Sequence, residues 1–330
     1  MIGNNSTTNV EWMSFQTYTL MNYLIQCVEA VLIVVGNSLT LIAVKKTKSL
    51  NRIPTNVFIV SLATSDGIIG LLIPILISVK LLDSDQIWIG TTCLLHGPYF
   101  SMFSISLLTL LAIAIDRYHA VVNPLVYRQR MTLRKARIIT VVIWIMMFGI
   151  ITGSTCYFGI YNNVIQLKTR VLGLLFPKLL MTIVKQLLIL SPVLGNVVIY
   201  IIIYKNLKSK NKVGPSGNNH ECCQNTSSKA TKSYVRMMVL VLAYLITACI
   251  PYYIIDGIVK QKNSNSPSWL VYLLDVSIIL FYSNSFMNPV IYSWKNRHFR
   301  EAYKTIMICE QSFGGTREIR RISTRIDTSV

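Results

Sequence analysis

Long apolar runs alternate with short polar segments along the whole chain. Seven of the runs reach the roughly 20 residues that an α-helix needs to cross a lipid bilayer. They cover, approximately, residues 20–44, 54–80, 90–121, 136–158, 178–204, 234–258 and 269–293. This pattern predicts an all-α membrane protein with a bundle of seven transmembrane helices.

Composition supports this prediction. Of the 330 residues, 52% are hydrophobic and only 14% are charged, whereas roughly 25% are charged in a typical soluble domain. The net charge of +19 would also suit a nucleic-acid-binding protein, but such proteins gather Lys and Arg on one folded face. Here the basic residues fill the gaps between apolar runs, so we expect no nucleic-acid partner.

The basic residues also predict the orientation of the chain. Most of the 32 Lys and Arg residues lie in every second gap and in the C-terminal segment. Cytoplasmic loops are the ones enriched in Lys and Arg. We therefore expect a multi-pass plasma-membrane protein with an extracellular N-terminus.

Four regions follow from these boundaries. Residues 1–19 are expected to form an extracellular tail, and residues 20–293 the seven-transmembrane bundle. Residues 294–309 are expected to form a short amphipathic eighth helix, and residues 310–330 a disordered cytoplasmic tail. The Gly-, Ser- and Asn-rich segment 205–233 is predicted to be a flexible cytoplasmic loop.

The eighth helix is predicted from its apolar spacing. Phe299, Tyr303 and Ile306 recur at helical intervals opposite a basic face, which is typical of a helix lying on the inner leaflet in contact with membrane lipid. Cys309 follows and is a candidate for palmitoylation. A plain free thiol is the alternative.

Polar residues inside the apolar runs are the candidates for function. Because the bilayer core holds no water, such groups face the bundle interior and usually mark function. Asp66 of the second run and Ser106 of the third can meet polar groups of the seventh run, namely Asn284, Ser285 and Asn288. A carboxylate among oxygen donors suits a hard cation. A protonated Asp66 in a hydrogen-bonded network is the alternative.

Several motifs fall on the expected helices. The third run ends in Asp116-Arg117-Tyr118 and is followed by Pro124-Leu125. The other runs contribute Gly36-Asn37, Asp66, Trp144, Pro192 with Tyr200, Pro251, and Asn288-Pro289 with Tyr292. With these residues the chain resembles a rhodopsin-like (class A) G protein-coupled receptor. The resemblance implies a receptor and not an enzyme, with heterotrimeric G proteins as partners and arrestin and receptor kinases as regulators.

The resemblance assigns a switch to the inner end of the third helix. An Asp116–Arg117 ion pair, next to Tyr118, would hold the receptor closed. On activation Arg117 would move toward Tyr200 and Tyr292, near Asn288-Pro289, while Pro124-Leu125 would contact the G protein. On the residues alone, charged side chains that extend to the headgroups are the better interpretation.

Class A receptors hold a sodium ion in the inactive state, and the polar set around Asp66 matches that site. The resemblance therefore implies sodium bound by Asp66, Ser106, Asn284, Ser285 and Asn288 as an allosteric ligand. No other cofactor is expected.

The ligand is expected to be an extracellular small molecule. The second and seventh runs look like those of adenosine receptors and, more loosely, amine receptors. Candidate ligand-binding residues are Tyr99, Phe103, Lys185, Cys249, Asp256 and Tyr282.

Several of these positions depart from the related receptors. Asp256 and Tyr282 replace the asparagine and histidine of adenosine receptors, and Tyr99 replaces the aspartate that binds amines. Glu29, Asp256 and Asp275 are substitute carboxylates. Lys185 has three interpretations: pairing with an acidic ligand, pairing with Asp256, or extending to the headgroups.

Two cysteines carry further expectations from the resemblance. Cys249 replaces the tryptophan usual in the sixth helix, which predicts high basal activity. Cys93 aligns approximately with the family's outer cysteine, and Cys156 is its candidate partner. A disulfide requires Cα atoms within about 7 Å, so the bridge and two free thiols both remain open.

A channel or transporter is the alternative class. A channel would line a continuous path with charges or carbonyls, whereas the intramembrane polar residues here gather in one cluster. A membrane hydrolase would need a nucleophile beside a base, and the four histidines lie at run ends or in loops.

Overall fold

A computed structural model describes residues 5–82, 95–166, 175–212, 221–262 and 267–311. The helices are α1 (Asn5–Lys46), α2 (Lys48–Asn51), α3 (Pro54–Leu82), α5 (Gly97–Val122), α6 (Pro124–Arg130), α7 (Leu133–Gln166), α8 (Leu175–Lys212), α9 (Glu221–Lys262), α10 (Ser268–Lys295) and α11 (Arg297–Gln311). Seven of them are long and apolar enough to cross a membrane. The predicted seven-helix bundle is therefore confirmed.

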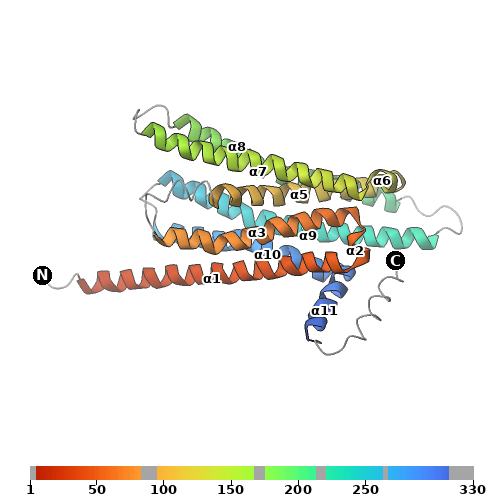
Figure 1. Ribbon diagram of the computed structural model, residues 1–330, viewed down its shortest axis with the longest axis horizontal. Coiled ribbons are helices and arrows are strands. Elements are labelled where there is room, and N and C mark those ends of the chain that lie inside the picture. Colours follow the sequence, from red (N-terminus) through yellow and green to blue (C-terminus); the bar gives the residue numbers. More distant parts are fainter. Residues whose placement is uncertain (1–4, 83–94, 167–174, 213–220, 263–266, 312–330) are drawn as a thin grey trace.

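The long helices lie side by side, and α2, α6 and α11 gather at one end of the bundle (Figure 1). Several helices exceed the predicted runs, although α5 begins at Gly97 and not at residue 90. Helix α1 begins at Asn5, inside the segment expected to be a tail. Helix α8 continues to Lys212 and α9 begins at Glu221, inside the segment 205–233 that was expected to be a loop. Hydropathy marks the part that crosses the bilayer, and polar residues continue a helix beyond it. Residues 312–330 of the expected disordered tail lie outside the described residues.

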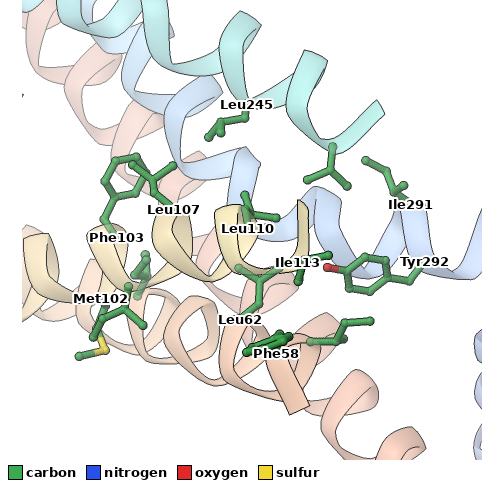
Figure 2. Packing of buried hydrophobic residues seen from close by; sticks show 14 of the residues in the cluster. Phe58, Leu62, Met102, Phe103, Leu107, Leu110, Ile113, Leu245, Ile291 and Tyr292 are labelled. Carbon is green, nitrogen blue, oxygen red and sulfur yellow. The ribbon is translucent and has the colours of Figure 1, made fainter. Parts of the chain in front are cut away.

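Helix α5 is the centre of the bundle. It is buried along most of its length and packs against α3, α7 and α8. Phe103, Leu107 and Leu110 point from α5 toward the helix that carries Leu245 (Figure 2). The helices at the periphery of the bundle expose apolar side chains toward the lipid instead, as at Ile145 of α7, which is 67% exposed. A membrane bundle is expected to bury its polar groups and expose its apolar ones.

Helix α11 packs against the bundle at the end that carries α2 and α6. The apolar residues Phe299, Tyr303 and Ile306, expected on the lipid surface, are buried. Tyr303 Oη lies 2.8 Å from Thr40 Oγ1 of α1, and the Phe299 ring stacks on Tyr292 at 5.7 Å. Burial raises the pKa of Tyr303 to about 12. The amphipathic helix is thus fixed to α1 and α10 through the face that was assigned to lipid.

Helices α1 and α3 approach each other closely at Gly70. A Cβ atom at this position would lie 2.8 Å from Ile33 Cγ2 and 2.9 Å from Val34 Cγ2. Ile33 is fully buried and has no space to move. Small residues at such contacts let the backbones of membrane helices approach each other.

Gly70→Ala is therefore expected to destabilise the protein. Forcing one extra methyl group into a filled contact costs roughly 1–3 kcal/mol, so the apparent melting temperature in detergent should fall by several degrees. Gly153→Ala is the matched control, because nothing lies within 4 Å of a Cβ atom there and alanine favours a helix over glycine. Equal melting temperatures for the two variants would contradict the close packing at Gly70.

Candidate functional site

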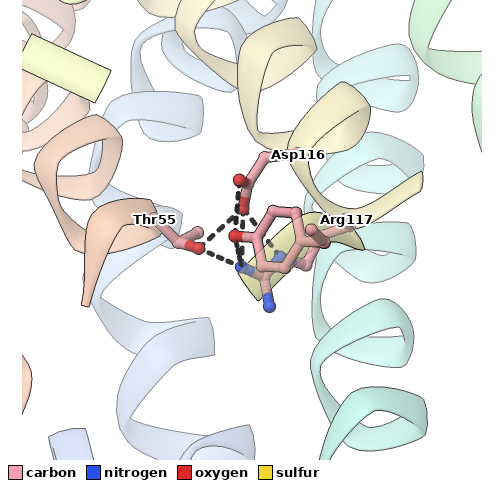
Figure 3. A network of polar contacts seen from close by, with 4 residues as sticks. Thr55, Asp116 and Arg117 are labelled. Atoms are coloured by element: carbon pink, nitrogen blue, oxygen red, sulfur yellow. Dashed lines mark hydrogen bonds and ion pairs between the residues drawn. The ribbon is translucent and has the colours of Figure 1, made fainter. Parts of the chain in front are cut away.

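A hydrogen-bonded network surrounds Asp116 toward the C-terminal end of α5 (Figure 3). Arg117 Nη2 lies 2.6 Å from Asp116 Oδ2. The Thr55 hydroxyl of α3 donates to Oδ2 at 2.6 Å, and the Tyr127 hydroxyl of α6 donates to Oδ1 at 2.7 Å. Arg117 also donates to Thr55. The predicted Asp116–Arg117 pair is present, and it joins three helices.

The network holds Arg117 against its own helix. Asp116 is 3% exposed, and its charge is offset by the guanidinium and by two hydroxyl donors. Burial and the nearby Asp116 charge raise the pKa of Tyr127 to about 12. Tyr127 therefore stays protonated at neutral pH and remains a hydrogen-bond donor. This arrangement is one of two states that a switch at Arg117 requires.

Sequence reasoning did not single out Thr55 or Tyr127 for this network. Tyr127 lies three residues after Pro124, and proline is favoured at the first position of a helix. Helix α6 starts at Pro124, so Tyr127 lies one helical turn further along. Pro124 could therefore have predicted the start of α6, but nothing in the sequence indicated that Tyr127 contacts Asp116.

The other predicted switch residues lie on the expected helices. Tyr200 of α8 and Tyr292 of α10 are buried, at 6% and 1% exposed. Tyr118 is half-buried and contacts the His119 ring edge-on at 5.3 Å. Pro124 and Leu125 begin α6, and their side chains lie outside the described residues. The movement of Arg117 toward Tyr200 and Tyr292 remains a prediction.

A second polar site surrounds Asp66, halfway along α3. Asp66 is fully buried, and Ser106, Asn284, Ser285 and Asn288 are each 3% exposed or less. Asn288 Nδ2 donates to Asp66 Oδ2 at 2.7 Å, and Ser285 Oγ donates to Oδ1 at 3.1 Å. Ser106 approaches the same carboxylate without a hydrogen bond of ordinary geometry. The structure brings these predicted residues into one buried layer.

Asn37 of α1 joins this layer and was not among the predicted site residues. Its amide donates to the Ser285 carbonyl at 3.1 Å. That carbonyl has no helical partner, because the residue four positions later is Pro289, which lacks an N–H. Among the described residues, Asn37 Oδ1 and Ser106 Oγ are buried without a hydrogen-bond partner. Two oxygen atoms near Asp66 thus have lone pairs to offer.

Toward the other end of the bundle, aromatic rings from three helices form a continuous group, which we call the outer aromatic cluster. Its members are Tyr99, Phe103, Tyr252, Tyr253, Phe281 and Tyr282. Phe281 is central: its ring centroid lies 4.6 Å from that of Phe103 and 4.7 Å from that of Tyr252. Tyr99 meets Tyr282 at 6.2 Å. Tyr252, Tyr253 and Phe281 were not among the predicted ligand residues.

Acidic residues adjoin this cluster. Asp256 lies within electrostatic reach of Tyr252 and Tyr253, and Glu29 lies within reach of Tyr282. Among the described residues, Glu29 Oε2 and the Tyr253 hydroxyl are buried without a hydrogen-bond partner. Cys249 is 6% exposed and adjoins Tyr99 and Tyr253. The side chain of Lys185 lies outside the described residues.

The Cys93–Cys156 bridge, left open by the sequence, stays a prediction. Cys156, near the end of the fourth membrane span, is partly exposed and carries a free thiol. Cys93 lies outside the described residues. The resemblance alone had suggested this pair.

Comparison with known proteins identifies the family. Residues 36–292 match the family model described as "7 transmembrane receptor (rhodopsin family)". The chain belongs to this family of receptors. The receptor is therefore a multi-pass membrane protein of the ligand-activated, G protein-coupled class, as its motifs predicted.

Individual relatives are distant and diverse. The receptor is 28% identical to adenosine receptor A2b of Mus musculus, in an alignment that covers 89% of this chain and 92% of the relative. It is 27% identical to the QRFP-like peptide receptor of Branchiostoma floridae, over 89% of this chain and 78% of the relative. It is 26% identical to trace amine-associated receptor 13c of Danio rerio, over 93% and 90%. Since these names cover nucleoside, peptide and amine receptors, similarity alone does not select a ligand.

Proposed function

We propose that the receptor detects an extracellular small molecule that carries an amine, and that the outer aromatic cluster binds it. The observation that carries this proposal is the buried carboxylate oxygen of Glu29, which has no hydrogen-bond partner among the described residues and lies near Tyr282. A buried carboxylate without a partner is costly. A ligand ammonium group would remove that cost.

The rings strengthen this choice. A cation over the face of a tyrosine or phenylalanine is attracted by the ring quadrupole, and the cluster provides six rings from α5, α9 and α10. Asp256 supplies a second acid near Tyr252. An adenine ring, in contrast, needs amide or imidazole partners, and Asp256 and Tyr282 occupy those positions here. An amine therefore fits the site better than a nucleoside.

Three further points belong to the proposal. The receptor lies in the plasma membrane with its N-terminus outside, as the distribution of basic residues supports. A sodium ion binds at Asp66 in the inactive state, supported by the free oxygens of Asn37 and Ser106. Receptor kinases and arrestin act on the inner face after activation.

The ligand proposal is tested by a screen with a G protein dissociation readout. Amines, nucleosides and acidic metabolites are applied to cells that express the receptor. We expect amines to activate it. Glu29→Gln should weaken the potency of the active amine roughly 10- to 150-fold, because a hydrogen bond to a charged group contributes about 1.5–3 kcal/mol.

Asp275→Asn is the matched control. This carboxylate lies on α10 beside Tyr18, at the α1–α10 contact, so potency should stay within about threefold of the wild type. A receptor that responds to nucleosides or acids and ignores amines would overturn the proposal. Equal potency in Glu29→Gln and the wild type would remove Glu29 as the anchor.

A further inference from the structure

A cavity of about 510 Å³ lies beside the Asp116 network. It is lined by residues of α3, α5, α7 and the short helix α6, and Asp116 and Tyr127 form part of its wall. Its volume falls within the roughly 300–1,000 Å³ that is usual for small-molecule sites. The cavity is at the opposite end of the bundle from the outer aromatic cluster and is separate from it.

We infer that this cavity binds an acyl chain of an anionic phospholipid from the adjacent membrane leaflet, with the headgroup on Arg130. The walls are mainly apolar and include Phe58, Ile115 and Ile139. Phe58 is 1% exposed and closes the inner side. An acyl chain would replace no hydrogen bonds in such a space.

The mouth of the cavity faces lipid. Ile115, Val126 and Ile139 line it and are 42%, 44% and 40% exposed. Ile115 and Ile139 belong to membrane-crossing segments, so their exposed surfaces contact acyl chains and not water. A lipid tail can therefore enter from the side, without passing through the bundle.

Charge at the rim selects an anionic headgroup. Arg130 and His119 line the cavity and are exposed, and the exposed residues Arg134, Lys135 and Arg137 follow at the start of α7. The acidic wall residue Asp116 is already paired with Arg117, so it opposes an anion only weakly. Anionic lipids are enriched in the cytoplasmic leaflet. Placing the site in that leaflet depends on the orientation proposed above.

The test is photolabelling of the purified receptor in phosphatidylcholine nanodiscs. The probe is phosphatidylserine with a diazirine in one acyl chain, and neither agonist nor G protein is added. We expect labels on peptides within residues 112–139. Arg130→Gln should lower labelling roughly fivefold, which is the effect of one basic residue near an anionic surface. Ile139→Trp, which fills the cavity, should abolish it.

Two control variants are matched to these changes. Arg134→Gln removes an exposed charge that does not line the cavity, and Ile145→Trp enlarges a lipid-facing residue of the same helix. Both should be labelled like the wild type. Equal labelling of Arg130→Gln and Arg134→Gln would overturn the headgroup contact. If an Ile139→Trp protein that melts like the wild type were fully labelled, the proposal that the acyl chain binds in this cavity would be rejected.

Competition identifies the occupant. Unlabelled phosphatidylserine should displace the probe, whereas phosphatidylcholine should not. If a free fatty acid displaced the probe and phosphatidylserine did not, the proposal that the occupant is a phospholipid would be rejected. Because no agonist is present, these results do not depend on whether the amine proposal is correct.

Discussion

Arg117→Ala is expected to lower agonist-stimulated GDP release roughly 10- to 150-fold while leaving the receptor at the cell surface. In the structure the guanidinium is 2.6 Å from Asp116 and only 13% exposed, so little of it is accessible to a partner protein. Activation would release it toward the G protein. Charge-assisted hydrogen bonds contribute roughly 1.5–3 kcal/mol, so nucleotide exchange should fall by a factor of roughly 10 to 150. Exchange is measured with purified heterotrimer and reconstituted receptor.

Surface expression should persist because Asp116 keeps two donors. Thr55 and Tyr127 still donate to its oxygens at 2.6 and 2.7 Å. Asp116→Asn should have the opposite effect and raise basal exchange, since Arg117 loses its charged partner. In the double variant Arg117→Ala/Asp116→Asn no buried carboxylate remains unpaired, and exchange should stay as low as in Arg117→Ala. Recovery of exchange in the double variant would show that Arg117→Ala fails through misfolding.

Sodium is expected to lower agonist affinity, and Asp66→Asn is expected to remove this effect. Asp66 accepts from Ser285 and Asn288, and nearby oxygens of Asn37 and Ser106 lack partners among the described residues. Such an oxygen-rich site suits a hard cation. An allosteric ion typically changes affinity roughly 5- to 150-fold. Agonist competition binding in sodium chloride, with choline chloride at equal ionic strength as reference, measures the change.

The alternative, a protonated Asp66, makes a different prediction. Wild-type affinity would then be the same in sodium and choline, and the ion site would be rejected. Thr109→Val is a matched control, because Thr109 is a buried polar residue of α5 whose hydroxyl lies beside Ser61, whereas the donors to Asp66 are Ser285 and Asn288. It should keep the sodium effect.

The sequence was most informative where the bilayer imposes a simple rule. A span must be long and apolar, so seven spans could be predicted, whereas the ends of α1, α8 and α9 extend into polar sequence that follows no such rule. Asp66 and Asn288 could be grouped because polar residues are rare inside a membrane. Thr55, Tyr127 and Asn37 could not, because an ordinary hydroxyl or amide gains its role only from a distant contact. Thr55 and Asp116, for example, are 61 positions apart.

The outer aromatic cluster, too, could be predicted from the sequence only in part. The resemblance placed Tyr99 and Tyr282 toward the ligand, and they do lie together in the structure, at 6.2 Å. Phe281 was missed although it is the central ring of the cluster, because a phenylalanine in an apolar run carries no distinguishing signal. Glu29 was noted only as a substitute carboxylate. Its burial beside Tyr282 depends on how α1 and α10 pack, which periodicity does not determine.

The amide of Asn37 has a mechanical consequence. Pro289 leaves the Ser285 carbonyl of α10 without a helical partner, and Asn37 of α1 donates to that carbonyl instead. A change in the course of α10 at this proline must therefore stretch a bond to α1. One turn further along α1, Thr40 contacts Tyr303 of α11 at 2.8 Å. A rearrangement that begins beside Asp66 would therefore be transmitted to α11 through α1, which contacts both α10 and α11.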